Sequence, residues 1–325
     1  MSRRTKKWWA GSSVIGMLAL VASMGIGMLG VSTSAGAATR PHRADVAERS
    51  AAARSTANAR AKSTTHSWHN TLASNTNGWC DASPPNSPCD GLPGDYGTIG
   101  IFKATARESA WGGYASGVTL AGQKKYARTT GGQDGGVPTA TGCTVPTNES
   151  CSGPYTLWGP KNLGNDVTFG SGFTTSLEMY VDAGWGDAHP GNVVDWDTAL
   201  QTTTEGFESD FVIDLCSTAT GWQVGWENGS GGCGASPGTP NPEHLNTSGW
   251  YTLTEQFTNL AGVVYATYTV TSNGSTGQNT PGTQVWTYTQ NTGFATATTG
   301  GPLYGWLPTE DVSGLPLAQL RLAVN

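Results

Sequence analysis

Hydrophobic and polar residues alternate strictly in two segments of the chain. In TTSLEMYVDA (174–183), three aliphatic residues alternate with two acidic residues and a tyrosine. In GFESDFVIDL (206–215), four large apolar residues alternate with three acidic ones. A period of two places the two sets on opposite faces of a β-strand. Both segments are therefore predicted to be half-exposed antiparallel strands whose apolar side faces the core.

The remainder of the chain after Ser67 supports an all-β fold. Short runs rich in Thr, Val, Tyr and Trp alternate with clusters of Gly, Asn, Pro and Ser at intervals of roughly ten residues. Helical periodicity is nearly absent, and the tail LPLAQLRLAVN (315–325) is typical of a closing strand. We therefore predict one antiparallel β-sandwich over residues 67–325, with no internal repeat or domain break.

The first 66 residues differ from this domain. Residues 1–37 combine a basic start, an apolar run and a small-residue site, Ala35–Ala37, and are predicted to be a secretory signal peptide. A membrane anchor is the alternative, because the apolar run spans residues 14–31. Residues 38–66 are Ala- and Arg-rich without an apolar face, which predicts a tether or pro-segment, or else a frayed helix. The mature protein is therefore expected to be extracellular.

The predicted domain is strongly acidic. From Ser67 onwards, seven Lys and Arg residues stand against 21 Asp and Glu residues, a formal balance of −14. Such a surface repels phosphate backbones and anionic lipids. Nucleic acid and membrane surfaces are therefore not expected partners after signal cleavage, whereas cations and neutral polar ligands are compatible with this charge.

Six cysteines in an exported chain indicate disulfides. The short spacings between neighbouring cysteines favour three local bridges, although fifteen connectivities are possible. A zinc site is disfavoured because the chain has no C-x-x-C and its five His residues are scattered. The predicted pairs are Cys80 with Cys89, Cys143 with Cys151, and Cys216 with Cys233.

Several phrases of the chain resemble the concanavalin A-like lectin and glucanase jelly rolls. The phrases GFTTSLEMYVDAGW, GFESDFVIDL, GWQVGWENGS and SGWYTLTEQFTN carry the resemblance, which covers roughly residues 165–325. None of these phrases is a specific catalytic signature. The resemblance implies an exported bacterial protein built on a concanavalin A-like jelly roll, with either glycan binding or glycan hydrolysis as its activity.

The family resemblance makes the acidic strand a candidate catalytic strand. Family-16-type β-glucanases carry E-x-D-x-E or E-x-D-x-x-E, with a nucleophile first and an acid/base last. Glu208 and Asp210 match the first positions, but Val212 or Ile213 stands where the last Glu is required. Asp214 is six residues from Glu208, on the order of 20 Å along a strand, whereas a retaining pair needs about 5 Å. The strand is therefore expected to be an ordinary acidic one.

A second catalytic hypothesis takes the carboxylates from two strands. Glu178 and Glu208 could face each other across a concave sheet, and so could Glu227 and Glu255. Paired carboxylates in a cleft acquire different pKa values and can act as acid and base. This hypothesis describes a glycoside hydrolase acting on β-glucan-type polysaccharides, and we retain it as the alternative function.

Tryptophan is the more distinctive feature of the domain, which holds eleven of the chain's thirteen. Large aromatics dominate core burial, and Trp222 and Trp226 of GWQVGWEN are expected in the core. Trp185 and Trp196 instead occur in a loop-like stretch, AGWGDAHPGNVVDWDTA, where an exposed role for the indoles is considered.

Calcium is a further alternative, and no other cofactor is expected. Asp90 and Asp95 lie in one Gly-rich stretch, and Asp187, Asn192, Asp195 and Asp197 in another. Oxygen ligands on such loops suit Ca²⁺, but Asx residues are also common in turns.

These observations favour a non-catalytic extracellular domain that binds polysaccharide or another glycan. A hydrolase is the second hypothesis and a structural extracellular protein the third. The predicted binding residues combine indoles with acidic side chains: Trp185, Asp187, Asp195, Trp196, Glu208 and Asp210.

Overall fold

The computed structural model describes residues 67–80, 98–103, 118–120, 122–130, 132–133, 151–159, 169–202, 208–228, 243–275, 277 and 282–325. All of them belong to one compact unit, Pro41–Asn325. The predicted signal peptide and the whole predicted tether lie outside the described residues, as do Cys89, Cys143, Cys233, Asp90 and Asp95. Within the described part of the chain, no helix is long and apolar enough to span a membrane.

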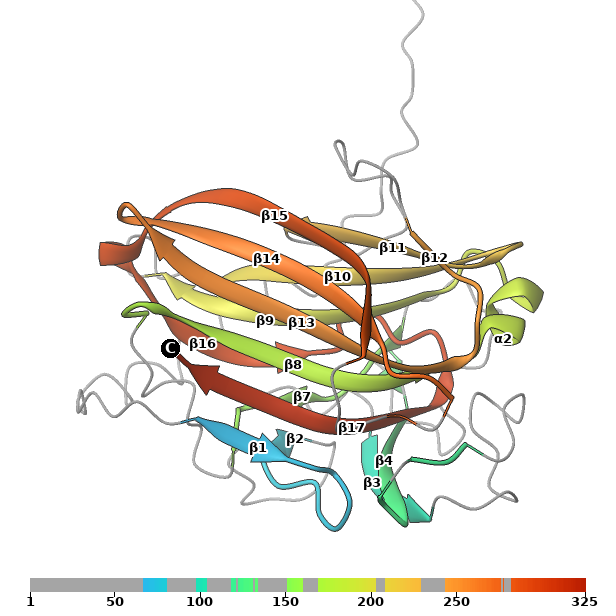
Figure 1. Ribbon diagram of the computed structural model, residues 1–325. Helices are drawn as coiled ribbons and strands as arrows, with labels where there is room; N and C mark the ends of the chain where they lie inside the picture. The colour runs from blue at the N-terminus through green and yellow to red at the C-terminus, as the bar shows by residue number, and fades with distance from the viewer. Residues whose placement is uncertain are drawn as a thin grey trace, which may run out of the picture. The chain divides into compact units, whose positions relative to one another are not determined.

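The described strands form two large antiparallel sheets packed as an open sandwich, which confirms the predicted all-β antiparallel sandwich (Figure 1). Sheet A has the order β15 (Thr283–Ala295), β14 (Val263–Ser272), β13 (Gly249–Leu260), β8 (Gly172–Val181), β17 (Ser313–Val324), β4 (Lys125–Thr130) and β3 (Thr98–Lys103), and β1 (Trp68–Asn70) also pairs with β17.

Sheet B contains the acidic strand. Its order is β12 (His244–Leu245), β11 (Gly221–Asn228), β10 (Glu208–Thr218), β9 (Val193–Thr202), β16 (Thr299–Trp306), β7 (Tyr155–Thr156) and β2 (Trp79–Cys80). Three small elements complete the described structure: the pair β5 (Gly132–Gln133) and β6 (Cys151–Ser152), the helix α2 (Ala183–Ala188) and the 3₁₀ turn η3 (Thr296–Thr298).

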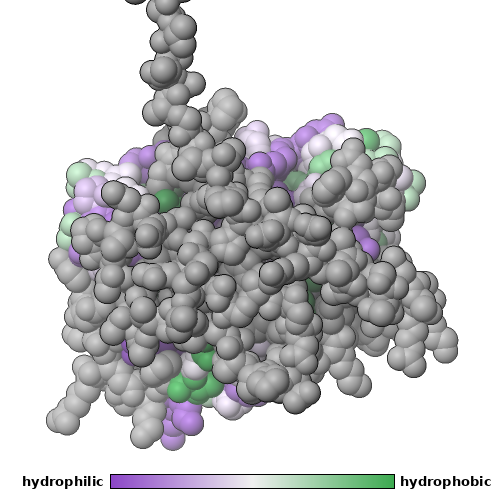
Figure 2. Space-filling model, turned by 180° about the vertical axis from the view of Figure 1, so that it is seen from behind, coloured by the Kyte–Doolittle hydropathy of each residue, from purple (hydrophilic) through white to green (hydrophobic). Residues whose placement is uncertain are grey.

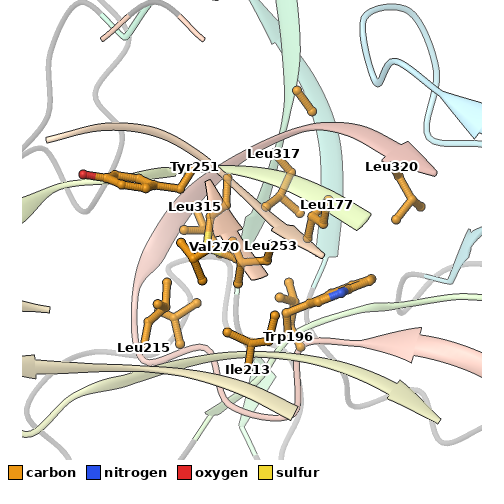
Figure 3. Packing of buried hydrophobic residues seen from close by; sticks show 14 of the residues in the cluster. Leu177, Trp196, Ile213, Leu215, Tyr251, Leu253, Val270, Leu315, Leu317 and Leu320 are labelled. Atoms are coloured by element: carbon orange, nitrogen blue, oxygen red, sulfur yellow. The ribbon is translucent and has the colours of Figure 1, made fainter. Parts of the chain in front are cut away.

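The alternating segments of the sequence are β8 and β10, and each directs its apolar residues into the space between the sheets. Figure 3 shows Leu177, Leu253 and Leu317 of sheet A facing Trp196 and Ile213 of sheet B. All five side chains are buried. Burying such side chains contributes about 1.5–3 kcal/mol each, so this interface is the main source of stability.

The C-terminal tail is a central strand of sheet A. β17 lies between β8 and β4, with Leu317 opposite Met179 and Leu322 opposite Thr175. The tail was predicted as a strand, and its central position follows from its burial, since Leu315, Leu317 and Leu320 have no exposed surface.

The described surface has few apolar side chains. In Figure 2, hydrophilic and hydrophobic described residues are interspersed on the visible face. Leu260 is the one large hydrophobic side chain recorded as exposed among the described residues. It stands at the end of β13, next to the turn into β14.

That turn yields a first prediction. Ala261 and Gly262 connect Leu260 to Val263, which are paired, and both have positive φ, 52° and 84°. This is a type I′ hairpin, which favours Asn-Gly because alanine is strained in the left-handed region. We expect Ala261→Asn to raise the free energy of unfolding by about 0.5–1 kcal/mol, measured from urea midpoints, with Ala261→Gly as the control for relief of strain. A lower midpoint for both variants would contradict the turn assignment.

Candidate functional site

Acidic residues gather on one face of three neighbouring strands of sheet B. The Cα register pairs Val212 of β10 with Asp197 of β9 on one side and with Glu227 of β11 on the other. Asp210 and Asp214 lie two residues away from Val212 along β10 and therefore share its face. Val212 is thus the centre of a cross of four carboxylates.

A fifth carboxylate extends this cross. Asp195 of β9 is the direct register partner of Asp214. Directly opposed residues of an antiparallel pair have Cβ atoms about 4.5–5.5 Å apart, and diagonal neighbours are about 7–8 Å apart. We call the five residues Asp195, Asp197, Asp210, Asp214 and Glu227 the carboxylate face.

The carboxylate face has a buried part and an outer part. Asp195, Asp197 and Asp214 are almost completely buried, whereas Asp210 and Glu227 are half-buried. Like charges placed directly opposite each other destabilise a sheet. Asp195 and Asp214 are such a directly opposed pair.

Contacts with the backbone and with a glycine shape the face locally. Asp197 Oδ1 accepts a hydrogen bond from the backbone N–H of Phe211 at 3.0 Å, which fixes this carboxylate against β10. Gly225 is the register partner of Asp214 on β11. A Cβ at Gly225 would lie 3.6 Å from Asp214 Oδ2, so β11 presents bare backbone beside this carboxylate.

The negative charge of the face acts through sheet B. Burial raises the pKa of Tyr268 well above its ordinary value; Glu255 adds to the shift, and so do Asp197 and Asp214 at smaller strength, while a hydrogen bond from Gln290 opposes it. Tyr268 lies on the inner side of sheet A, on β14.

Two of the predicted binding residues differ from expectation because their indoles are buried. Trp196 has no exposed surface and packs against Trp158 and Trp79, with ring centroids 6.0 and 6.5 Å away. Trp185, on α2, is stacked between Trp222 at 5.7 Å and His189 at 4.5 Å. Neither ring has an open face for a sugar.

The other predicted binding residues are distributed between two places. Asp195, Glu208 and Asp210 belong to the adjacent strands β9 and β10 of sheet B. Asp187 is exposed on α2, whose first turn is capped by Asp182 through a 2.9 Å bond from the backbone N–H of Trp185. Glu208 pairs with Gln201 in the Cα register, at the end of β10.

The alternative catalytic pair is not brought together. Glu178 lies on β8 in sheet A, whereas Glu208 lies on β10 in sheet B. Glu178 is buried and its Oε1 accepts a 2.8 Å hydrogen bond from Asn273. Glu227 and Glu255 are likewise on strands of different sheets.

Cysteine and metal sites are only partly covered by the structure. No complete disulfide is seen among the described side chains, although Cys216 takes part in one. The three predicted pairings stay predictions. Among the described residues, no group of three or more His, Cys, Asp or Glu side chains has a geometry suited to a metal ion.

Three members of the carboxylate face, Asp197, Asp214 and Glu227, were not among the predicted binding residues. The segment VVDWDTALQT (193–202) has an alternation that could have revealed β9, with Asp195 and Asp197 on one side and Trp196 on the other. The prediction of a loop-like stretch over residues 183–199 is therefore wrong for residues 193–199, which belong to β9.

Comparison with known proteins adds no family to this description. No protein-family model matches the chain, and no curated protein matches its sequence.

Proposed function

We propose that the protein is an extracellular domain that binds an uncharged polysaccharide through the carboxylate face of sheet B. The observation that carries the proposal is the register, which gathers five acidic residues on one face of β9, β10 and β11. The two-sheet antiparallel sandwich is compatible with the concanavalin A-like jelly roll that the sequence resembles. The extracellular location rests on the predicted signal peptide.

The chemistry of the face suits hydroxyl groups. Carboxylates only accept hydrogen bonds when ionised, and a bond to a charged acceptor is roughly twice as strong as a neutral one. Asp210 and Glu227 are half-buried, and so is the amide of Gln223, which follows the same side of β11. A neutral sugar supplies several hydroxyl donors without adding charge, whereas nucleic acid or an acidic glycan would be repelled.

Binding is tested by retention on insoluble neutral glycans such as glucan, chitin and xylan. We expect the double variant Asp210→Asn, Glu227→Gln to bind at least about tenfold more weakly than the unmodified protein, since two charge-assisted bonds are weakened. Glu243→Gln is the matched control, because Glu243 is an exposed acidic residue that precedes β12 and is not a member of the carboxylate face.

The outcomes separate the hypotheses. Equal retention of the double variant and the protein would overturn the carboxylate face as the binding site. Absence of retention on every glycan, with the fold intact, would favour the structural role. A parallel series with Ca²⁺ and with a chelator tests whether a cation contributes.

Hydrolysis is a second candidate, supported by one specific geometric feature. Asp210 and Glu227 are diagonal neighbours around Val212, which corresponds to about 7–8 Å. Inverting glycosidases hold their two carboxyl groups about 6.5–9.5 Å apart. Product analysis in the same tubes decides between the candidates: shortened glycan that disappears in Glu227→Gln would establish the enzyme, and intact bound glycan would support binding alone.

A further inference from the structure

Two glutamate side chains are completely buried between the sheets, and neither belongs to the carboxylate face. Glu255, on β13 of sheet A, is 1% exposed, and Glu310, which forms an isolated bridge with Val194 of β9, is 0% exposed. The parity of β13 directs Glu255 to the inner side of sheet A, together with Leu253 and Phe257, and the isolated bridge places Glu310 opposite Val194, a core residue of β9.

Each of these glutamates joins the two sheets through threonine hydroxyl groups. Glu255 accepts a hydrogen bond from Thr198 of β9, and the hydroxyl of Thr175 lies 3.5 Å from its Oε2. Thr175 and Thr198 are themselves linked across the sheets at 2.7 Å. In the second contact, Thr129 of β4 donates to Glu310 Oε1 at 2.6 Å.

The second oxygen of each carboxyl group has no hydrogen-bond partner among the described residues. These atoms are Glu255 Oε1 and Glu310 Oε2. An ionised carboxylate requires several donors, and burying one without them is very costly. A neutral carboxylic acid, in contrast, is tolerated in such a place.

The charged and titratable groups near both glutamates are mostly acidic. Tyr268 faces Glu255 from β14, while Asp197 and Asp214 lie beyond it on sheet B. Asp311 is next to Glu310, and Arg128, beside Thr129 on β4, is packed against Gly314. Burial raises the pKa of Glu255 and of Glu310 well above the ordinary value, and only threonine hydroxyls oppose the shift.

We infer that the sandwich is an acid-stabilised fold, closed by two neutral carboxylic acids that must ionise at higher pH and then weaken the contact between the sheets. The direction in which stability changes with pH follows from the linkage between proton binding and folding. A group that binds its proton more tightly in the folded state contributes its full stability below the unfolded pKa, near 4.3 for Glu, and this contribution is lost as pH rises through the folded pKa. The protein is therefore suited to acidic surroundings.

Thermal unfolding between pH 4 and pH 8 tests the inference. We expect the Tm of the protein to fall with rising pH by about 3–5 °C for every unit by which each pKa exceeds its ordinary value. Glu255→Gln and Glu310→Gln keep the shape of the neutral acid. They should therefore raise Tm near pH 7 while changing it little at pH 4.

Glu243→Gln is the matched control, because it removes one negative charge from an exposed position. The Glu243→Gln variant distinguishes the effect of the two buried glutamates on Tm from the effect of general charge repulsion in an acidic protein. Its Tm should change with pH in parallel with the Tm of the unmodified protein. A Tm that is highest near neutral pH, or Gln variants that lose as much stability at pH 7 as at pH 4, would overturn the inference.

A measurement without substitution guards against variants that fail to fold. The infrared absorption of protonated carboxyl groups should persist in the folded protein at pH 6 and disappear on unfolding in urea. Its absence from the folded protein at that pH would equally overturn the inference.

Discussion

Replacing Trp196 by alanine is expected to lower the free energy of unfolding by about 3–5 kcal/mol, the range for truncating a buried Trp. The indole has no exposed surface and lies between the sheets (Figure 3). It packs against Trp158 and Trp79. Gly305 of β16 leaves space for the indole of Trp196. A Cβ at position 305 would stand 2.6 Å from the Trp196 ring. The surroundings of a truncated core side chain relax only partially, so Trp196→Ala is expected to leave a cavity.

Urea unfolding of purified protein measures this loss, and two further variants calibrate it. Leu260→Ala removes a side chain that is 58% exposed and should cost less than about 0.5 kcal/mol. Trp196→Phe should fall between the two. If Trp196→Ala kept normal stability but lost retention on glycans, Trp196 would be a surface binding residue after all.

The fold class was predictable because alternation and turn residues are local signals. β8 and β10 each have one apolar and one acidic face, so their period of two is visible in the sequence. β9 has the same alternation, but a short segment of Gly, His and Pro precedes it and resembles a continuing loop. Asp and Asn are common in turns, and this tendency concealed the strand.

The acidic strand was predictable, whereas the carboxylate face was not. The face depends on which strands become neighbours of β10 and in which register, and both are set by contacts between distant parts of the chain. The E-x-D-x-E pattern, in which Val212 stands at the position of the last Glu, concerns only residues along a single strand. Asp197 and Glu227 supply carboxylates at the same level from the two adjacent strands, which no spacing within the strand reveals.

Tryptophan illustrates the same limit. Trp222 is buried in the core, as predicted, and Trp226 is half-buried against it. Trp196 alternates with Asp195 and Asp197, so one face of β9 is aromatic and the other is acidic. Composition alone does not say which face of β9 is covered by the opposite sheet. The sequence between Trp185 and Trp196 suggested that these two indoles are exposed, whereas both are buried.

The substitution Val212→Glu, which would complete the E-x-D-x-E pattern of family-16-type β-glucanases, is expected to destabilise the protein by about 3–5 kcal/mol at pH 7, the cost of a buried charge without a partner. Val212 has no exposed surface. Its register partners are Asp197 and Glu227, and Asp210 and Asp214 flank it on β10. A new carboxylate would therefore enter a site that already holds four.

Val212→Gln is the matched control, because it has the size and shape of Glu without the charge. It should cost about 1–3 kcal/mol, the penalty for burying a neutral polar group. The difference between the two variants therefore isolates charge repulsion, and it should shrink as pH falls toward 4, where carboxyl groups gain protons. Equal stability of the two variants at pH 7 would contradict the crowding of negative charge around Val212 and would indicate that a cation compensates the face.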